Sequence, residues 1–119
     1  MTSIPNRGEV WLVQFAPSVG AEIQKERPAV VMNPSSVGRL PLRIVVPITD
    51  WKAHYTRAPW FVFLPATATN GLLKDSGADA FQVKSLSKKR FKAKLGTLAE
   101  SEIDAIADAV VLCFGYRSS

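Results

Sequence analysis

The stretch GAEIQKERPAVV, residues 20–31, gathers charge just before an apolar run, through Glu22, Lys25, Glu26 and Arg27. Proline restricts the residue before it to extended backbone, so Arg27 is expected at the mouth of a strand with a fixed direction. Pro28 has no N–H and suits the first residue of that strand. A guanidinium at such a place can bind a phosphate through its planar fork of donors. The alternative is that Arg27-Pro28 only starts a strand and that the neighbouring charges are solvated.

A second stretch, VVPITD at residues 45–50, leaves an apolar run through Pro47 and ends on the hydroxyl of Thr49. A threonine hydroxyl can donate a hydrogen bond to a non-bridging phosphate oxygen. The alternative is that Thr49 bonds its own backbone in a turn.

The segment WKAHYTRAPW, residues 51–60, mixes aromatic and basic side chains, namely Trp51, Lys52, His54, Tyr55, Arg57 and Trp60. Base stacking and phosphate contact by such a mixture suit single-stranded RNA. The alternative is that Trp60 belongs to the core and Trp51 packs beneath the loop. His54 is the only histidine and titrates near neutral pH, so it is a candidate general base or, alternatively, a surface or RNA-contacting residue.

The basic run Lys88, Lys89, Arg90, Lys92 and Lys94 is either a phosphate track or a solvated turn. The net charge of +5, from 15 Lys and Arg against 10 Asp and Glu, is compatible with a polyanionic partner or with none.

One Cys and one His exclude a disulfide framework and a Cys/His metal cluster, and we expect no metal site and no cofactor. No apolar run nears the roughly 20 residues of a membrane span and no signal pattern opens the chain, so we expect a cytoplasmic protein without membrane contact.

The remaining pattern is mostly strand. Short apolar or alternating runs predict strands at 9–15, 28–32, 42–48, 60–64, 79–86 and 92–98, with Phe81 and Val83 on one face and a turn at 87–90. The segment 100–115 has apolar residues at helical spacing after an acidic first turn, with Gly115 as its stop and Cys113 as a buried, inert thiol. These elements predict one domain over residues 1–119, a mainly β (α+β) fold with a small curled antiparallel sheet or barrel and a C-terminal helix.

Taken in order, these segments resemble one known family. The run RGEVWLVQFAPSVGAEIQKERPAVVM, residues 7–32, resembles the N-terminal signature of the MazF/PemK toxins. That signature is an R-G-[ED]-[IV]-[WY] strand, a G-x-E-Q-type loop and an R-P-[AV]-[VL]-[VI] strand. VVPIT matches the next family strand, GLLKDSGADAFQVKSLSKKRF resembles a later segment, and KLGTL with the acidic-start helix closes the match. The resemblance covers roughly residues 6–115.

The resemblance implies a sequence-selective, metal-independent endoribonuclease, the toxin of a toxin–antitoxin pair. It implies an SH3-like barrel, a homodimer, single-stranded RNA as the substrate and an acidic antitoxin with a segment that folds on binding. Cleavage without a metal means attack of a 2′-OH on its own phosphate, leaving 2′,3′-cyclic phosphate and 5′-OH ends. The family's catalytic Arg falls on Arg27, its catalytic Thr or Ser on Thr49, and its loop Glu on Glu22.

Arg27 would stabilise the charge of the phosphorane, and Thr49 would donate to a non-bridging oxygen. Arginine stays protonated, so the general base is left open between Glu22, if burial raises its pKa, and His54. The predicted RNA contacts are Lys25, Trp51, His54, Tyr55, Arg57, Gln82 and Lys84. This chain has Gln82-Val83-Lys84 where the family often has Gln-Ile-Arg, and Ile23 in place of the loop Gln; both departures bear on substrate preference.

Two other functions remain open. A CcdB-like toxin shares the fold and poisons gyrase by binding, but its helix typically ends in Trp-Gly-Ile, whereas this chain ends in FGYRSS. A plain SH3-like RNA- or protein-binding module would make the Arg27 and Thr49 pattern purely structural. The loops at 16–26 and 50–59 would set the recognition sequence, and they depart most from the family pattern.

Overall fold

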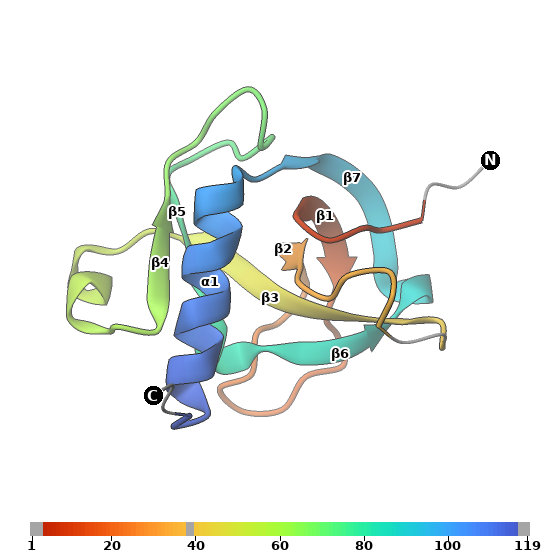
Figure 1. The fold of residues 1–119 in the computed structure, drawn as a ribbon, viewed down its shortest axis with the longest axis horizontal. Helices are drawn as coiled ribbons and strands as arrows, with labels where there is room; N and C mark the ends of the chain where they lie inside the picture. Colours follow the sequence, from red (N-terminus) through yellow and green to blue (C-terminus); the bar gives the residue numbers. More distant parts are fainter. Residues whose placement is uncertain (1–3, 38–39, 117–119) are drawn as a thin grey trace.

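The computed structural model describes residues 4–37 and 40–116 (Figure 1). The end of the chain beyond Tyr116, which entered the comparison with CcdB, lies outside these residues. Seven strands form an antiparallel sheet: β1 (Glu9–Gln14), β2 (Glu26–Val31), β3 (Leu42–Asp50), β4 (Phe61–Leu64), β5 (Ser76–Asp79), β6 (Lys84–Ser87) and β7 (Phe91–Thr97). Three short 3₁₀ helices, η1 (Ala53–Arg57), η2 (Ala80–Gln82) and η3 (Lys88–Arg90), precede the single helix of the described residues, α1 (Glu100–Cys113).

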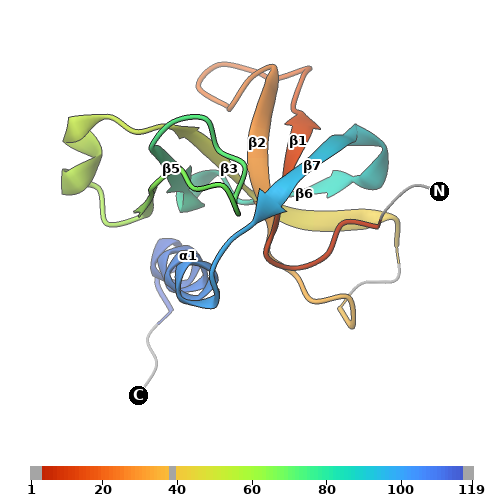
Figure 2. The same cartoon turned by 90° about the horizontal axis from the view of Figure 1, so that it is seen from above.

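The strands run in the order β4-β5-β3-β2-β1-β7, and β6 pairs with β3. The prediction of a mainly β fold with an antiparallel sheet and a C-terminal helix is therefore confirmed. The sheet curls strongly (Figure 2), but no pairing within the described residues joins its two end strands, β4 and β7, so the word barrel fits its curvature rather than a closed ladder.

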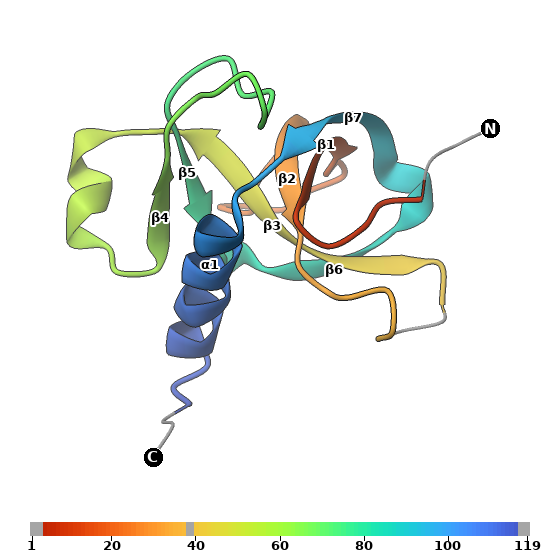
Figure 3. The same cartoon turned by 45° about the horizontal axis from the view of Figure 1, so that its top comes forward.

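Strand β3 connects the two halves of the sheet, as Figure 3 shows. Its first residues pair with β6, its middle residues pair with β2, and residues 48–50 pair with β5. The end of β3, which carries Thr49, therefore leaves β2 and joins the smaller β4-β5 sheet.

Two apolar clusters occupy the two faces of the central strands. Because successive side chains of a strand point to opposite faces, Val10, Val30 and Val46 pack in the cluster that includes Ile103 and Ile106 of α1. Their neighbours Trp11, Ala29 and Val45 pack in the second cluster, with Phe15 and Leu86. Burial on both faces explains why β2 and β3 read as continuous apolar runs rather than as alternating ones.

The prediction of one strand over 79–86 is wrong. Asp79 ends β5, the turn η2 follows, and β6 begins only at Lys84. Phe81 is 70% exposed whereas Val83 packs against the core, so the two do not share a face. The sequence SGAD of β5 carries no clear strand signal, because Gly, Ala and Asp have low strand propensity. These residues fit here because the strand is buried and Gly77 lies directly beneath Trp51.

The C-terminal helix forms as predicted. The carboxylate of Glu102 accepts a hydrogen bond from the N–H of Ala99 at 3.0 Å, and Gly115 follows the helix with a φ of +71°. The expectation that Cys113 is buried is wrong, because its side chain is only half-buried at the end of the helix. None of the described helices is long and apolar enough to cross a membrane.

Candidate active site

Arg27 and Thr49 line one cleft, and the register between β2 and β3 explains why. The pairing runs Val31 with Val45, Val30 with Val46 and Ala29 with Pro47. Continued by two residues, the same antiparallel register places Arg27 opposite Thr49. The ladder stops before that point, since Pro28 has no N–H to form the next rung. The two strands therefore separate just where the two predicted catalytic residues stand.

The cleft between the separated strands has a volume of about 320 Å³. Its lining comprises Ile23, Arg27, Pro28, Ile48, Thr49, Asp50, Lys52, Tyr55 and Ser76. The structure thus brings together Arg27, Thr49 and Tyr55 of the predicted site residues. Strand β2, strand β3, turn η1 and the loop between β1 and β2 each contribute part of the wall.

Arg27 is exposed at the cleft, in extended backbone as expected before a proline. No carboxylate within residues 4–37 and 40–116 forms an ion pair with it, and no hydrogen bond to these residues engages its guanidinium. Its five donors are therefore available to an anion that enters the cleft.

Thr49 is half-buried, and within residues 4–37 and 40–116 its hydroxyl has only a long contact of 3.4 Å to the carbonyl oxygen of Asp50. A hydroxyl–carbonyl hydrogen bond is normally about 2.7–2.8 Å long, so this contact is weak. The hydroxyl can therefore turn to donate to a ligand oxygen at little cost.

The aromatic residues of η1 and its surroundings pack against one another and form a wall. Tyr55 stacks on Phe61 with ring centroids 3.9 Å apart and planes 8° apart. Trp51 packs edge-on against Tyr55 at 5.7 Å and against Phe63 at 5.0 Å. Trp51 thus packs beneath the loop, the alternative weighed from the sequence, and it holds the tyrosine that lines the cleft.

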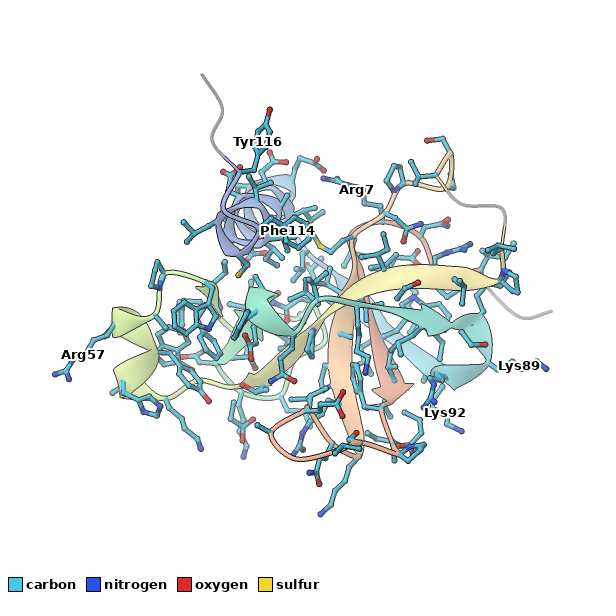
Figure 4. The ribbon with its side chains drawn as sticks, turned by 90° about the horizontal axis from the view of Figure 1, so that it is seen from below. Arg7, Arg57, Lys89, Lys92, Phe114 and Tyr116 are labelled. Carbon is cyan, nitrogen blue, oxygen red and sulfur yellow. The ribbon has the colours of Figure 1, made fainter. Side chains whose placement is uncertain are left out.

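Seven of the ten predicted residues lie outside the cleft lining, and four of these are on the surrounding surface. His54 is exposed, and the centroid of its ring lies 4.7 Å from that of Tyr55. Arg57 points away from the body of the protein (Figure 4). Lys25 is exposed on the β1–β2 loop, where its φ is +64°. Glu22 is exposed, and its carboxylate accepts a hydrogen bond from the N–H of Val19 at 2.6 Å, so the burial that would favour it as a base is absent.

Gln82 and Lys84 line a second, smaller hollow of about 230 Å³ with Glu22, Phe81 and Val83. The predicted residues are therefore divided between two hollows, with the β1–β2 loop contributing Ile23 to one and Glu22 to the other.

Asp50 and Ser76 also line the cleft and were not predicted from the sequence, and Lys52 was named only as a basic member of segment 51–60. Asp50 and Lys52 lie between Thr49 and Tyr55 in the sequence, and that position was the available signal. Asp50 is exposed and lies 3.5 Å from the ammonium of Lys74. Ser76 belongs to β5, which was not predicted, and pairs with Asp50 across the sheet. Among the described residues, no three His, Cys, Asp or Glu side chains converge as a metal-ion site would require.

The fold and the cleft define a small basic α+β protein with an unpaired arginine and a hydroxyl at the point where two strands separate. The family model of the PemK-like, MazF-like toxins of type II toxin–antitoxin systems matches residues 6–114. The chain therefore belongs to this toxin family.

One relative agrees with this assignment, and two solved structures share the fold. The chain is 33% identical to the endoribonuclease MazF9 of Mycobacterium tuberculosis, over 89% of this chain and 92% of the relative. The crystal structure of MazF from Deinococcus radiodurans superposes with a TM-score of 0.81 at 24% identity, covering 97% of this chain and 100% of that chain. An endoribonuclease from a mycobacterial species, in complex with its cognate antitoxin, superposes with a TM-score of 0.76 at 16% identity, covering 97% and 99% of the two chains.

Proposed function

We propose that this toxin is a sequence-selective endoribonuclease that cleaves single-stranded RNA without a metal ion, using Arg27 and Thr49. Its family and its endoribonuclease relative support the RNA-cleaving activity. The observation that carries the assignment of residues is the cleft in which the continued β2–β3 register sets Arg27 opposite Thr49.

The reaction is a transesterification within the RNA. The ribose 2′-oxygen forms a bond to the adjacent phosphorus while its proton passes to a base, and the bond from phosphorus to the 5′-oxygen breaks as that oxygen gains a proton. The guanidinium of Arg27 stabilises the negative charge of the pentacoordinate phosphorane, and the Thr49 hydroxyl donates to a non-bridging oxygen. The products carry 2′,3′-cyclic phosphate and 5′-OH ends.

The general base is proposed to be Glu22 or His54. Neither lines the cleft in this structure, so either would reach the 2′-OH only after the loop that carries it moves toward the bound RNA. Asp50 already lines the cleft and is a third group to test for this role.

The remaining predicted residues are assigned to RNA binding outside the scissile phosphate. Lys25, Arg57 and Lys84 supply positive charge, His54 and Tyr55 contact bases or sugars, and Trp51 supports Tyr55. Gln82 was predicted as a further RNA contact. These assignments predict that affinity falls as salt rises, because phosphate contacts release counterions.

We also propose a cognate antitoxin and a homodimer as the protein partners. The family description, a toxin of toxin–antitoxin systems, supports the first. The second is supported by apolar side chains that gather where η2 meets the end of α1: Phe81 is 70% exposed, Leu112 52% and Phe114 70%. Figure 4 shows Phe114 and Tyr116 at this end of the helix. Exposed apolar surface of this kind marks protein interfaces.

A cytoplasmic location follows from the proposed action on cellular RNA. We also infer that residues 1–119 act as one domain, because β1, β2 and β3 contribute to both apolar clusters.

The proposal is tested by mapping the products of a long single-stranded RNA incubated with protein that has been freed of any co-purified partner. Cuts that recur at one short sequence are expected. A complex with gyrase in the absence of RNA cleavage would instead favour the CcdB-like alternative, and RNA binding without products would favour a binding module.

A further inference from the structure

The side-chain amide of Gln82 connects a buried carboxylate to the β1–β2 loop. Its Nε2 donates to Oδ2 of Asp79 at 3.0 Å, and its Oε1 accepts from the backbone N–H of Ile23 at 2.6 Å. The other carboxylate oxygen of Asp79 accepts from the N–H of Phe81 at 3.2 Å. Three elements, β5, η2 and the loop, are thus joined by one chain of hydrogen bonds.

The buried carboxylate of Asp79 fixes which groups donate and which accept in this series of hydrogen bonds. Asp79 is 7% exposed, and an ionised carboxylate only accepts hydrogen bonds. The amide of Gln82 must therefore turn its NH₂ group toward Asp79, which leaves its oxygen for Ile23. A neutral amide at position 79 would reverse this orientation and set the Gln82 NH₂ group against the N–H of Ile23.

Within the described part of the chain, the bond to Gln82 is the one long-range hydrogen bond of loop residues 17–24, whereas Ala16 at the start of the loop is held separately, its carbonyl oxygen accepting from Arg90 Nη1 at 2.6 Å. Among the described residues, the other hydrogen bonds of residues 17–24 stay within the segment 15–25: Ser18 with Phe15 and Ile23, Val19 with Glu22, and Gln24 with Gly20. Ile23 is also the loop residue that lines the cleft beside Arg27 and packs against the second apolar cluster. Its position therefore decides the shape of the cleft wall.

We propose that Asp79 and Gln82 are positioning residues that hold the β1–β2 loop, through the N–H of Ile23, in the conformation that forms the cleft. The proposal rests on the proposed function, because it assigns the pair to the same cleft. It gives Gln82 a role in ordering the loop in place of the direct RNA contact expected from the sequence.

The test reverses the donor–acceptor direction of the Asp79–Gln82–Ile23 hydrogen bonds and then restores it. Asp79→Asn turns the Gln82 amide away from Ile23, and Gln82→Glu places two carboxylates side by side. In the double variant, the NH₂ group introduced at position 79 can donate to the carboxylate introduced at position 82, whose second oxygen again accepts from Ile23. Asp75→Asn, which changes a carboxylate that accepts from the N–H of Ala66, is the matched control.

The first readout is hydrogen exchange at the Ile23 amide without RNA. Each single variant should raise the exchange rate of the Ile23 amide about tenfold, which is the effect expected from losing one hydrogen bond. The double variant should return that rate to within about twofold of wild type. Unchanged exchange in both single variants, or no recovery in the double variant, would overturn the chain of hydrogen bonds. This readout does not depend on cleavage, so it separates a failure of this inference from a failure of the proposed nuclease activity.

The second readout is cleavage of a short RNA under the same conditions. Each single variant should lower kcat/KM about tenfold, and the double variant should recover it. If Gln82 contacted RNA directly, the double variant would stay inactive, because a carboxylate at position 82 would repel phosphate. Restored exchange with unrestored cleavage would therefore overturn the positioning role. If either single variant folds poorly, Gln82→Met takes its place. This variant keeps the side-chain volume without the hydrogen bonds, and it should show the same rise of about tenfold in exchange and the same loss of about tenfold in kcat/KM.

Discussion

Replacing Arg27 with alanine should remove activity and leave the fold intact. The guanidinium makes no ion pair or hydrogen bond with the described residues, and the residue is exposed. Substitutions of this kind change the free energy of unfolding by no more than about 0.5 kcal/mol. Extended backbone at position 27 is imposed by Pro28 and by the pairing with Val13, so alanine keeps it.

The loss of activity can be estimated from the role of the side chain. A single donor to a developing oxyanion contributes about 2.7–4 kcal/mol, or about 10²–10³ in rate. Arg27 would supply two parallel donors and a full charge, so the Arg27→Ala variant should lose at least about 10³-fold in kcat. Arg27→Lys keeps the charge but not the fork, and its activity should lie between those of the wild type and the alanine variant.

The assay compares single-turnover cleavage of one RNA by the three proteins, with urea unfolding as the control for the fold. A drop of less than about tenfold in the alanine variant, with the fold preserved, would refute the role given to Arg27, since that is less than one oxyanion donor contributes. A large loss of stability would refute the claim that the residue is structurally free.

Four further predictions concern stability and binding. Burial raises the pKa of Glu9, but hydrogen bonds from the Asn6 N–H, the Trp11 indole and Lys94 outweigh burial and hold that pKa below its ordinary 4.5. Glu9→Gln should lower the free energy of unfolding by about 1–3 kcal/mol at pH 7. Measured by urea unfolding, this difference between the two proteins should shrink as the pH falls through the folded pKa. Burial raises the pKa of Asp79 above its ordinary 3.8, although hydrogen bonds from Gln82 and Phe81 act to lower it. The contribution of Asp79 to folding stability is therefore fully present below pH 3.8 and is lost as pH rises through the folded pKa. Over that pH range, the free energy of unfolding of the wild type should fall relative to that of Asp79→Asn. Gly77→Ala would set a Cβ 2.9 Å from the Trp51 ring, and a thermal melt should report about 1–3 kcal/mol of destabilisation; an unchanged melt would mean that the aromatic wall is loose. Replacing Lys88, Lys89 and Lys92 with alanine should flatten the dependence of RNA affinity on salt if these residues form a phosphate track, whereas an unchanged slope would identify a solvated turn.

Arg27 and Thr49, proposed as catalytic residues from the sequence, line one cleft because of local geometry. Arg27 and Thr49 stand close to Pro28 and Pro47, and short apolar strands of known direction bring such positions together once their register is fixed. The apolar runs of β2 and β3 also indicated burial on both faces, as the two clusters confirm.

The part that the sequence did not predict depends on tertiary contacts. Strand β5 is made of residues with low strand propensity and exists because Gly77 lets the ring of Trp51 lie on it. The break at η2 depends on Asp79, whose carboxylate caps the turn through the N–H of Phe81. The side-chain orientation of Gln82, which decides between an RNA contact and a loop support, follows from a carboxylate whose burial no local pattern reveals.

The central claim is metal-free cleavage of RNA in the Arg27–Thr49 cleft. Its most direct test is incubation of a long single-stranded RNA with the protein in excess EDTA, followed by analysis of the product ends. Cleavage at a recurring short sequence, with 2′,3′-cyclic phosphate and 5′-OH ends, is expected. Folded, partner-free protein that leaves the RNA intact under these conditions, or that yields 3′-OH and 5′-phosphate ends, would contradict it.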